Sequence, residues 1–307
     1  MNYLLLILLF LAFYLPLILN KKKICKKTLL VMLLVISSFI PLGVASDFKN
    51  NYGWHVDYMK YKEIHKYSTG KSQKIALIDS GISRFQVKDN NLNLTKQNNE
   101  LDTVGHGTMM YSLIKGNSND ILGIAPNTEV ISIKVVEKDG SILPQTMVKA
   151  IDKAIKQNCT VINLSLGSYQ YNAEISDIID TAIKKNIAVV AASGDYGTND
   201  MMFPANKKGV ISVGSLSKGG KISNFTNSPS KTTINLPGEY IKTINHSKHI
   251  EYTSGTSQST ALLSGFVALI KDYTYQRNIK LTNDELIKLL SKKNTNYPHI
   301  FNRITNS

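Results

Sequence analysis

Cysteine is almost absent from this chain, which contains only Cys25 and Cys159 among its 307 residues. The two stand far apart, and no cluster of cysteine and histidine has the spacing of a zinc site. The sequence therefore excludes a small disulfide-stapled scaffold and a cysteine-rich metal domain. We expect Cys159 to be a small buried core residue, and we predict neither a metal nor another cofactor.

Acidic residues are also scarce, since 22 Asp and Glu stand against 36 Lys and Arg, for a formal net charge of +14. Five of the lysines lie within residues 21–27, which leaves +9 for the rest of the chain. Such a surface could attract anionic lipid or cell-wall polymer, but lysines scattered over a solvated surface are the simpler interpretation. No nucleic-acid motif accompanies the charge, so nucleic acid is not an expected partner.

Internal repeats and long linkers are missing too, so residues 47–307 are predicted to form one large domain. Short apolar runs alternate there with helical patterns, which predicts an α/β fold with a mostly parallel sheet and helices on both faces. The last helix has a clear start signal, a capping box of Thr282 and Glu285. The expected strands lie near 74–79, 130–136, 160–165, 187–192 and 209–214, and the expected helices near 107–115, 145–157, 174–185, 258–274 and 283–292.

Residues 1–46 form a separate hydrophobic region. Two apolar runs, 3–19 and 29–45, each have about the length of a minimal membrane span. The lysines between them favour the cytoplasmic side, which predicts a membrane hairpin with the domain outside the cytoplasm. Alternatively, the second run is a signal peptide cleaved near Ala45, and the domain is secreted. Both interpretations export the domain.

Three short motifs carry the chemistry. Asp79 stands in an Ile-Asp-Ser-Gly motif, His106 in Gly-His-Gly-Thr and Ser257 in Ser-Gly-Thr-Ser. Taken singly, each has an ordinary interpretation as a turn, a structural histidine or a helix cap. Together they contain what a serine nucleophile needs, because an imidazole must take the hydroxyl proton and a carboxylate must orient the imidazole.

In this chain order the motifs resemble the catalytic triad of subtilisin-type serine proteases. Further similar segments are Leu-Gly-Ile-Ala-Pro at 122–126, Val-Ile-Asn-Leu-Ser-Leu-Gly at 161–167 and Val-Val-Ala-Ala-Ser-Gly at 189–194, so the resemblance spans about residues 52–293. It implies a subtilisin-like fold in which Ser257 is the nucleophile, His106 the base and then the acid, and Asp79 the group that orients the imidazole. Ser257 would begin a buried helix, where backbone N–H groups favour a developing oxyanion.

The resemblance also implies a substrate cleft. One wall, formed by Ser165, Leu166 and Gly167, would pair with an extended peptide by adding it as a strand, although a plain sheet strand is the alternative interpretation. The other wall, formed by Ala192, Ser193 and Gly194, would shape the primary specificity pocket, together with the segment 201–203. These six residues are the expected substrate-binding residues. Asp200 beside that pocket suggests a preference for Lys or Arg before the scissile bond, while an ordinary surface aspartate is the simpler interpretation.

Asp195 departs from the family pattern, in which an Asn at this position donates a hydrogen bond to the oxyanion. An ionised carboxylate only accepts hydrogen bonds, so Asp195 would have to be protonated to donate one. Gln258 stands where many relatives have Met, and Ala261 where a Pro is common. We interpret Asp195 as tuning the oxyanion region rather than as the mark of an inactive enzyme.

Calcium is supported only weakly. The family's strong calcium site uses an Asp shortly after the triad Asp, where this chain has Lys88 and Asp89, and a loop that is slightly short here, around residues 117–121. The residues therefore leave a calcium site open without supporting one.

The predicted function is hydrolysis of peptide bonds in an exported peptide or protein by a membrane-anchored serine endopeptidase. Only 33 residues separate Ser46 from Asp79, and such compact subtilases resemble leader peptidases that trim one dedicated precursor. A catalytically impaired module that grips peptides without cutting them is the alternative. A third interpretation is a processing partner in a membrane export complex.

Overall fold

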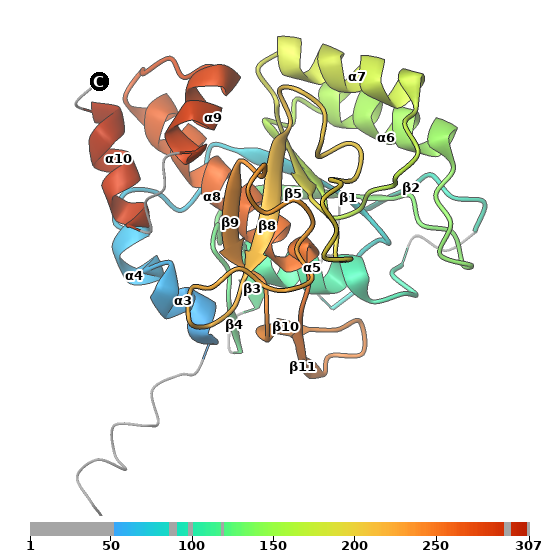
Figure 1. Cartoon of the computed structure of the whole chain (residues 1–307), viewed down its shortest axis with the longest axis horizontal. Helices are drawn as coiled ribbons and strands as arrows, with labels where there is room; N and C mark the ends of the chain where they lie inside the picture. The colour runs from blue at the N-terminus through green and yellow to red at the C-terminus, as the bar shows by residue number, and fades with distance from the viewer. Residues whose placement is uncertain (1–51, 86–90, 98–100, 118–119, 292–295, 306–307) are drawn as a thin grey trace, which may run out of the picture. The chain divides into compact units, whose positions relative to one another are not determined.

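The protein is described from a computed structural model that covers residues 52–85, 91–97, 101–117, 120–291 and 296–305 (Figure 1). The two apolar runs of residues 1–46 lie outside these ranges, as does most of the segment expected for calcium, so those predictions stay predictions. Among the helices of the described ranges, none is both long enough and apolar enough to cross a membrane.

A seven-stranded parallel sheet forms the centre of the fold, in the order β2-β5-β1-β6-β7-β8-β9. The chain places β5 on one side of β1 and β6 on the other, so the strand order reverses at β1. In open parallel sheets such a switch point leaves a crevice at the carboxyl ends of the strands, where ligands bind. The strands are β1 (Lys74–Asp79), β2 (Asn91–Asn93), β5 (Glu129–Lys134), β6 (Val161–Leu164), β7 (Ala188–Ala192), β8 (Ile211–Leu216) and β9 (Ile234–Pro237).

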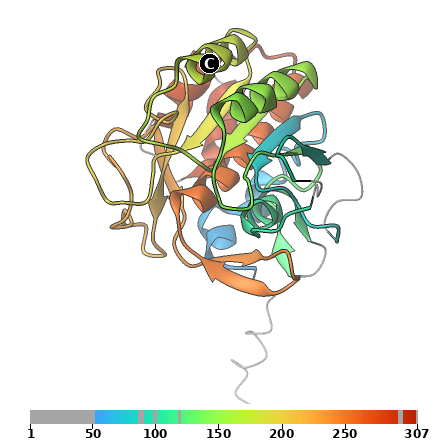
Figure 2. The same cartoon turned by 90° about the vertical axis from the view of Figure 1, so that its right-hand side faces the viewer.

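Helices cover both faces of this sheet (Figures 1 and 2). Strand β1 shows why two cores form, since Ile75 and Leu77 face one cluster while Ala76 and Ile78 face the other. The first cluster includes α5 (His106–Lys115) and α8 (Thr256–Gln276), and the second includes α6 (Pro144–Lys156) and α7 (Ala173–Lys184). The amphipathic helices α6 and α7 lie side by side in both views.

Helix α8 is buried along most of its length because it packs on the sheet and is covered by elements from both ends of the domain. Its hydrophobic residues therefore run around the whole helix instead of along one stripe. Figure 1 places these covering elements together at one side of the body. They are α3 (Trp54–Tyr58), α4 (Tyr61–Ile64), α9 (Asn283–Ser291) and α10 (Tyr297–Thr305).

The structure confirms the predicted α/β architecture. Each of the five expected strands and five expected helices is present, with ends that differ by at most two residues. The capping box is formed as well, because Thr282 Oγ1 donates to Glu285 Oε2 at 2.8 Å and accepts from Glu285 N at 3.3 Å. Buried Cys159 is also confirmed.

The sequence did not predict the shorter elements. Strands β2 and β9 extend the sheet at its two edges, where a few residues carry little periodicity. Two antiparallel pairs were missed too: β3 (Gly116–Asn117) with β4 (Ile121–Leu122), and β10 (Ile241–Ile244) with β11 (Ile250–Thr253). The helices α3, α4 and α10 also went unpredicted, because the first two are only one turn or so long.

Candidate active site

Asp79 and His106 come together at the carboxyl end of β1. Asp79 ends the strand and is only 2% exposed, while His106 is the first residue of α5. The imidazole Nδ1 lies 2.8 Å from Asp79 Oδ1 and 3.0 Å from Oδ2. A carboxylate so close holds the ring with Nδ1 protonated and leaves Nε2 to act on a proton.

A second buried carboxylate, Asp102, organises the turn that leads into His106. Its Oδ1 accepts hydrogen bonds from the Ser80 hydroxyl at 2.9 Å and from Gly105 N at 2.7 Å. Its Oδ2 accepts from both the backbone N (2.9 Å) and the hydroxyl (2.6 Å) of Thr108. Ser80 in turn accepts from Gly107 N at 2.9 Å. The end of β1 and the start of α5 are thereby joined by one buried polar network.

The surroundings of His106 favour its charged form. Burial lowers the pKa of His106, but the charge of Asp79, the hydrogen bond to it and the charges of Asp102 and Asp195 raise that pKa, and the net effect is an increase. An imidazolium that forms during a reaction is therefore stabilised at this position.

Close packing around Gly107 explains why glycine follows the histidine. A Cβ at Gly107 would lie 2.2 Å from the backbone oxygen of Gly81 and 3.2 Å from Asp79 Oδ1. A side chain there would push α5 away from the end of β1. The glycine thus allows the close approach that brings the imidazole to the carboxylate.

Ser257 is the second residue of α8, as the sequence predicted. Its hydroxyl donates to the backbone oxygen of Ser165 at 3.1 Å, and the Ser165 hydroxyl donates back to the Ser257 carbonyl at 3.0 Å. Among the residues that the structure describes, no hydrogen bond joins Ser257 to His106. The serine is therefore held against the wall of the expected cleft, in an orientation that substrate would have to change before proton transfer to His106.

Asp195 lies beside the first turn of the same helix. Its Oδ1 accepts the backbone N–H of Thr256 at 2.7 Å, in keeping with the attraction of a helix N-terminus for negative charge. A Cβ on Gly255 would lie 3.0 Å from Asp195 Oδ2 and 2.8 Å from Gln258 Oε1. The Gln258 oxygen is buried without a hydrogen-bond partner within the described part of the chain. Asp195 and Gln258, two departures from the family pattern, thus both lie close to Gly255 at the start of α8.

The predicted substrate-binding residues form two neighbouring walls. Ser165 is buried, Leu166 is half-buried and Gly167 is exposed, and they follow directly after β6. Within the described ranges, the backbone groups of Leu166 and Gly167 make no hydrogen bonds, which leaves them free to pair with an extended peptide. An apolar pocket of about 270 Å³, lined in part by Tyr171 and Ile175, adjoins this wall.

The other wall follows β7. Ala192 and Ser193 are buried, and Gly194 adopts φ = 111°, a conformation that favours glycine. The Gly194 N–H lies 3.3 Å from the hydroxyl oxygen of Thr256, the neighbour of Ser257. The two predicted walls therefore meet at the start of α8.

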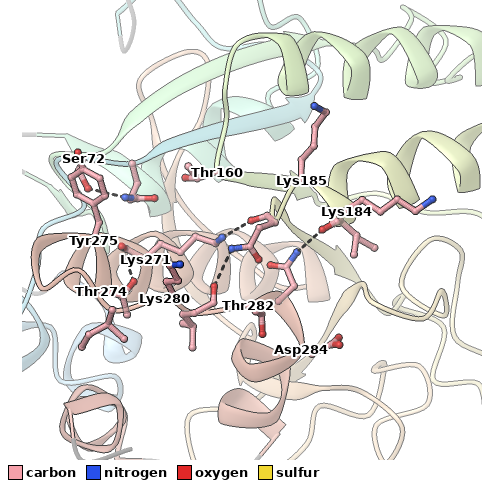
Figure 3. A pocket seen from close by; sticks show the side chains of 16 residues that line it. Ser72, Thr160, Lys184, Lys185, Lys271, Thr274, Tyr275, Lys280, Thr282 and Asp284 are labelled. Carbon is pink, nitrogen blue, oxygen red and sulfur yellow. Dashed lines mark hydrogen bonds between the residues drawn. The ribbon is translucent and has the colours of Figure 1, made fainter.

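A larger pocket of about 760 Å³ lies at the opposite edge of the sheet, beside residues that precede the strands, such as Gln73, Thr160 and Asn186 (Figure 3). Lys271 donates to the Asn186 carbonyl there at 2.7 Å, and burial lowers the pKa of Lys271 to about 8. Figure 3 shows the amines of Lys184 and Lys185 directed away from that of Lys271. The lysines therefore do not converge on one point. Because the pocket is lined by residues that precede the strands, it is separate from the site at their carboxyl ends.

Metal ligands are not grouped within the described ranges, where no three His, Cys, Asp or Glu side chains are arranged to hold an ion. Lys88 and Asp89, which bear on the calcium prediction, lie outside those ranges.

Comparison with known proteins places these features in a family. Residues 70–305 match the Subtilase family, and that range contains every site residue named above. The chain belongs to the Subtilase family.

Relatives of this subtilase include proteases of Bacillus subtilis. The minor extracellular protease Epr is 28% identical over 264 residues, which cover 83% of this chain but only 40% of Epr. The major intracellular serine protease is 30% identical over 245 residues, which cover 73% of this chain and 76% of the relative. Subtilisin E is 28% identical over 239 residues, which cover 74% of this chain and 63% of subtilisin E.

A solved structure shares the fold. The prenylagaramide maturation protease PagA superposes with a TM-score of 0.65 at 22% sequence identity, over 78% of this chain and 93% of PagA. At this identity the likeness shows the subtilase fold alone.

Asp102 is the main site residue of this subtilase that the sequence interpretation missed. A signal for it existed, because an aspartate shortly before a Gly-His helix start can accept the free N–H groups of the first turn. Which of the 22 acidic residues does so is decided by the fold.

Proposed function

We propose that this chain is a serine endopeptidase in which Ser257 is the nucleophile, His106 the general base and then acid, and Asp79 the orienting carboxylate. Membership of the Subtilase family and the relatives named as serine proteases support this proposal. The observation that carries it is the pairing of His106 Nδ1 with Asp79 at 2.8 Å, at the carboxyl end of the parallel sheet.

In the proposed reaction, Ser257 Oγ attacks the scissile carbonyl carbon and passes its proton to His106 Nε2. The carbonyl oxygen gains negative charge at the N-terminus of α8, where the Ser257 N–H can donate to it. His106 then gives its proton to the leaving amine as the carbon–nitrogen bond breaks. Water deacylates the serine by the same steps in reverse, again with His106 as the base.

The substrate is proposed to be an exported peptide or protein, held along Ser165, Leu166 and Gly167. The backbone groups of Leu166 and Gly167, which make no hydrogen bonds within the described ranges, support binding of an extended chain. The apolar runs at 3–19 and 29–45 support a membrane anchor with the peptidase domain outside the cytoplasm, or release after cleavage near Ala45. A fold shared with a protein named as a maturation protease supports processing of a dedicated precursor.

A second function, peptide binding without cleavage, is favoured by one observation. The Asp195 carboxylate stands beside the N-terminus of α8, where an amide donor would be expected to stabilise the oxyanion. A negative charge there opposes the charge that develops on the substrate.

Labelling of the 307-residue chain with a fluorophosphonate serine probe tests these functions. An active enzyme should be labelled at Ser257, labelling should vanish in Ser257→Ala, and it should persist in Ser254→Ala, which removes a hydroxyl three residues away. A folded protein without labelling would contradict the peptidase, and recovery of labelling in Asp195→Asn would then favour the binding module.

A further inference from the structure

The side chain of Met202 fills the gap between the two walls of the proposed substrate cleft. A Cβ built on Gly194 would lie 2.8 Å from Met202 Sδ and 2.9 Å from Met202 Cγ. A Cβ built on Gly167, in the opposite wall, would lie 3.2 Å from Met202 Cβ and 3.9 Å from its Cε. The thioether chain therefore contacts both glycines, one on each wall.

This gap matters because of its position next to Ser257. Ser257 Oγ lies 3.1 Å from the backbone oxygen of Ser165, and the hydroxyl of the adjacent Thr256 lies 3.3 Å from Gly194 N. A peptide carbonyl attacked by Ser257 carries its own Cα about 1.5 Å away. The side chain on that Cα, which belongs to the residue before the scissile bond, would therefore lie close to both walls and to the space between the two glycines.

The backbone of Met202 is fixed in the same place. Met202 N donates to Ser193 O at 3.0 Å, which ties it to the wall that follows β7. The next residue, Phe203, pairs with Ser168 through two backbone hydrogen bonds of 2.8 Å each, which ties it to the other wall. The side chain can change rotamer, as methionine does readily, but its Cβ stays between the walls.

Core packing does not account for Met202. Its neighbour Met201 packs against the apolar cluster around α6 and α7, whereas Met202 belongs to neither hydrophobic cluster of the described residues. Met202 is half-buried and faces glycines, which provide little apolar surface. A residue in this position has more effect on what enters the gap than on the stability of the domain.

We propose that Met202 closes the pocket for the residue before the scissile bond and restricts that residue to a small side chain such as alanine or glycine. The proposal rests on the proposed function, because it assumes that Ser257 attacks the substrate. It replaces the preference for Lys or Arg that the sequence suggested through Asp200. That residue lines a different pocket, together with Tyr169 and Lys207.

The test uses peptidyl phosphonates, which react with a serine nucleophile and carry the side chain of the residue before the scissile bond. Alanine and phenylalanine derivatives are compared on the 307-residue chain, on Met202→Gly and Met202→Ala, and on the matched control Met201→Gly. A fluorophosphonate without an amino-acid side chain measures the nucleophile itself. The melting temperature of each variant shows whether it is folded.

In the wild type, the alanine derivative should react at least about 10²-fold faster than the phenylalanine derivative, since a single methylene already changes discrimination by 10- to 200-fold. Met202→Gly should reverse the preference and Met202→Ala should reduce it, whereas Met201→Gly should leave it unchanged. If the phenylalanine derivative reacted faster in the wild type, the inference about Met202 would be overturned. Labelling by the fluorophosphonate would still uphold the peptidase in that case. A folded wild type that no probe labels would overturn both.

Discussion

The two halves of the proposed site have contrasting surroundings. On the base side, Asp102 is 5% exposed, and its carboxylate accepts hydrogen bonds from the Ser80 hydroxyl, just after β1, and from backbone and side-chain groups at the start of α5. On the nucleophile side, Asp195 is exposed and the Ser257 hydroxyl is bonded to the wall of the cleft. Gln258 Oε1 lacks a partner there as well, within the described part of the molecule.

The difference indicates that the proposed base is already held in position, whereas the hydroxyl of the proposed nucleophile would have to turn toward it. Buried, fully satisfied polar networks hold side chains in one arrangement. A hydroxyl with one hydrogen bond of 3.1 Å needs only a change of rotamer to leave its partner. Substitutions on the base side should therefore reduce activity through lost geometry, and those near Asp195 should change the stabilisation of charge.

The largest effect is expected for Asp79→Asn. The amide can offer only one oxygen to the imidazole and favours the wrong tautomer, so the rate of fluorophosphonate labelling should fall by about 10⁴-fold. Asp272→Asn is a matched control, because Asp272 is also buried and accepts from Ser68 and Ser72, but it lies in a different network. Equal losses in both variants would show that the effect is structural.

Asp195→Asn should change the rate in the opposite direction. The Asn oxygen can keep the hydrogen bond from Thr256 N, while the new amide can donate to the oxyanion, a contribution of about 10²- to 10³-fold in a subtilisin. Removal of the charge should also lower the pKa of His106, because Asp195 helps to raise it. The acid limb of the pH–rate profile should therefore move to lower pH. Unchanged rate and profile would place Asp195 outside the chemistry.

Asp102→Asn should decrease the labelling rate by up to about 10²-fold, the cost of misplacing a catalytic group by roughly 1 Å. The Asn side chain cannot accept all the hydrogen bonds that the carboxylate accepts from Ser80, Gly105 and Thr108. It also removes a charge that raises the pKa of His106, so the acid limb should again move to lower pH. Titration of the His106 ring by NMR measures that shift without substrate. A lower melting temperature with an unmoved titration would mean that Asp102 is only structural.

A smaller and separate pH effect is expected from His55, far along the chain from these halves. His55 is fully buried, its ring nitrogens have no partner among the described residues, and burial lowers its pKa from 6.5 to about 3. Below pH 6.5 the unfolded chain binds a proton that the folded chain does not, so stability should fall by about 1.4 kcal/mol per pH unit until the folded histidine titrates.

His106 acts in the opposite direction, because its raised pKa favours the folded state at low pH and loses that effect as pH rises. Denaturant unfolding of the wild type and of His55→Phe between pH 4 and 7 separates the two contributions. The substitution should flatten the dependence on pH. An equal slope in both proteins would contradict the assignment to His55.

Long, periodic elements were predictable because their signal is local. The buried run of β1 and the capping box of α9 can be recognised from adjacent residues, and both appear where expected. The edge strand β9 was not predictable, since its four residues pair only where β8 presents an edge. The hairpin β10–β11 is a separate pair, and the four residues of each of its strands carry little periodicity.

The sequence by itself determined the α/β architecture, the order of the motifs and the position of Ser257 at a helix start, because each depends on side chains close together along the chain. Only the tertiary structure decided which groups from distant parts of the chain come into contact. Asp102 reaches Ser80 over 22 positions, Asp195 reaches Thr256 over 61, and Met202 comes between Gly167 and Gly194. Such contacts depend on how strands and helices pack, and packing is set by the whole hydrophobic core rather than by any one segment.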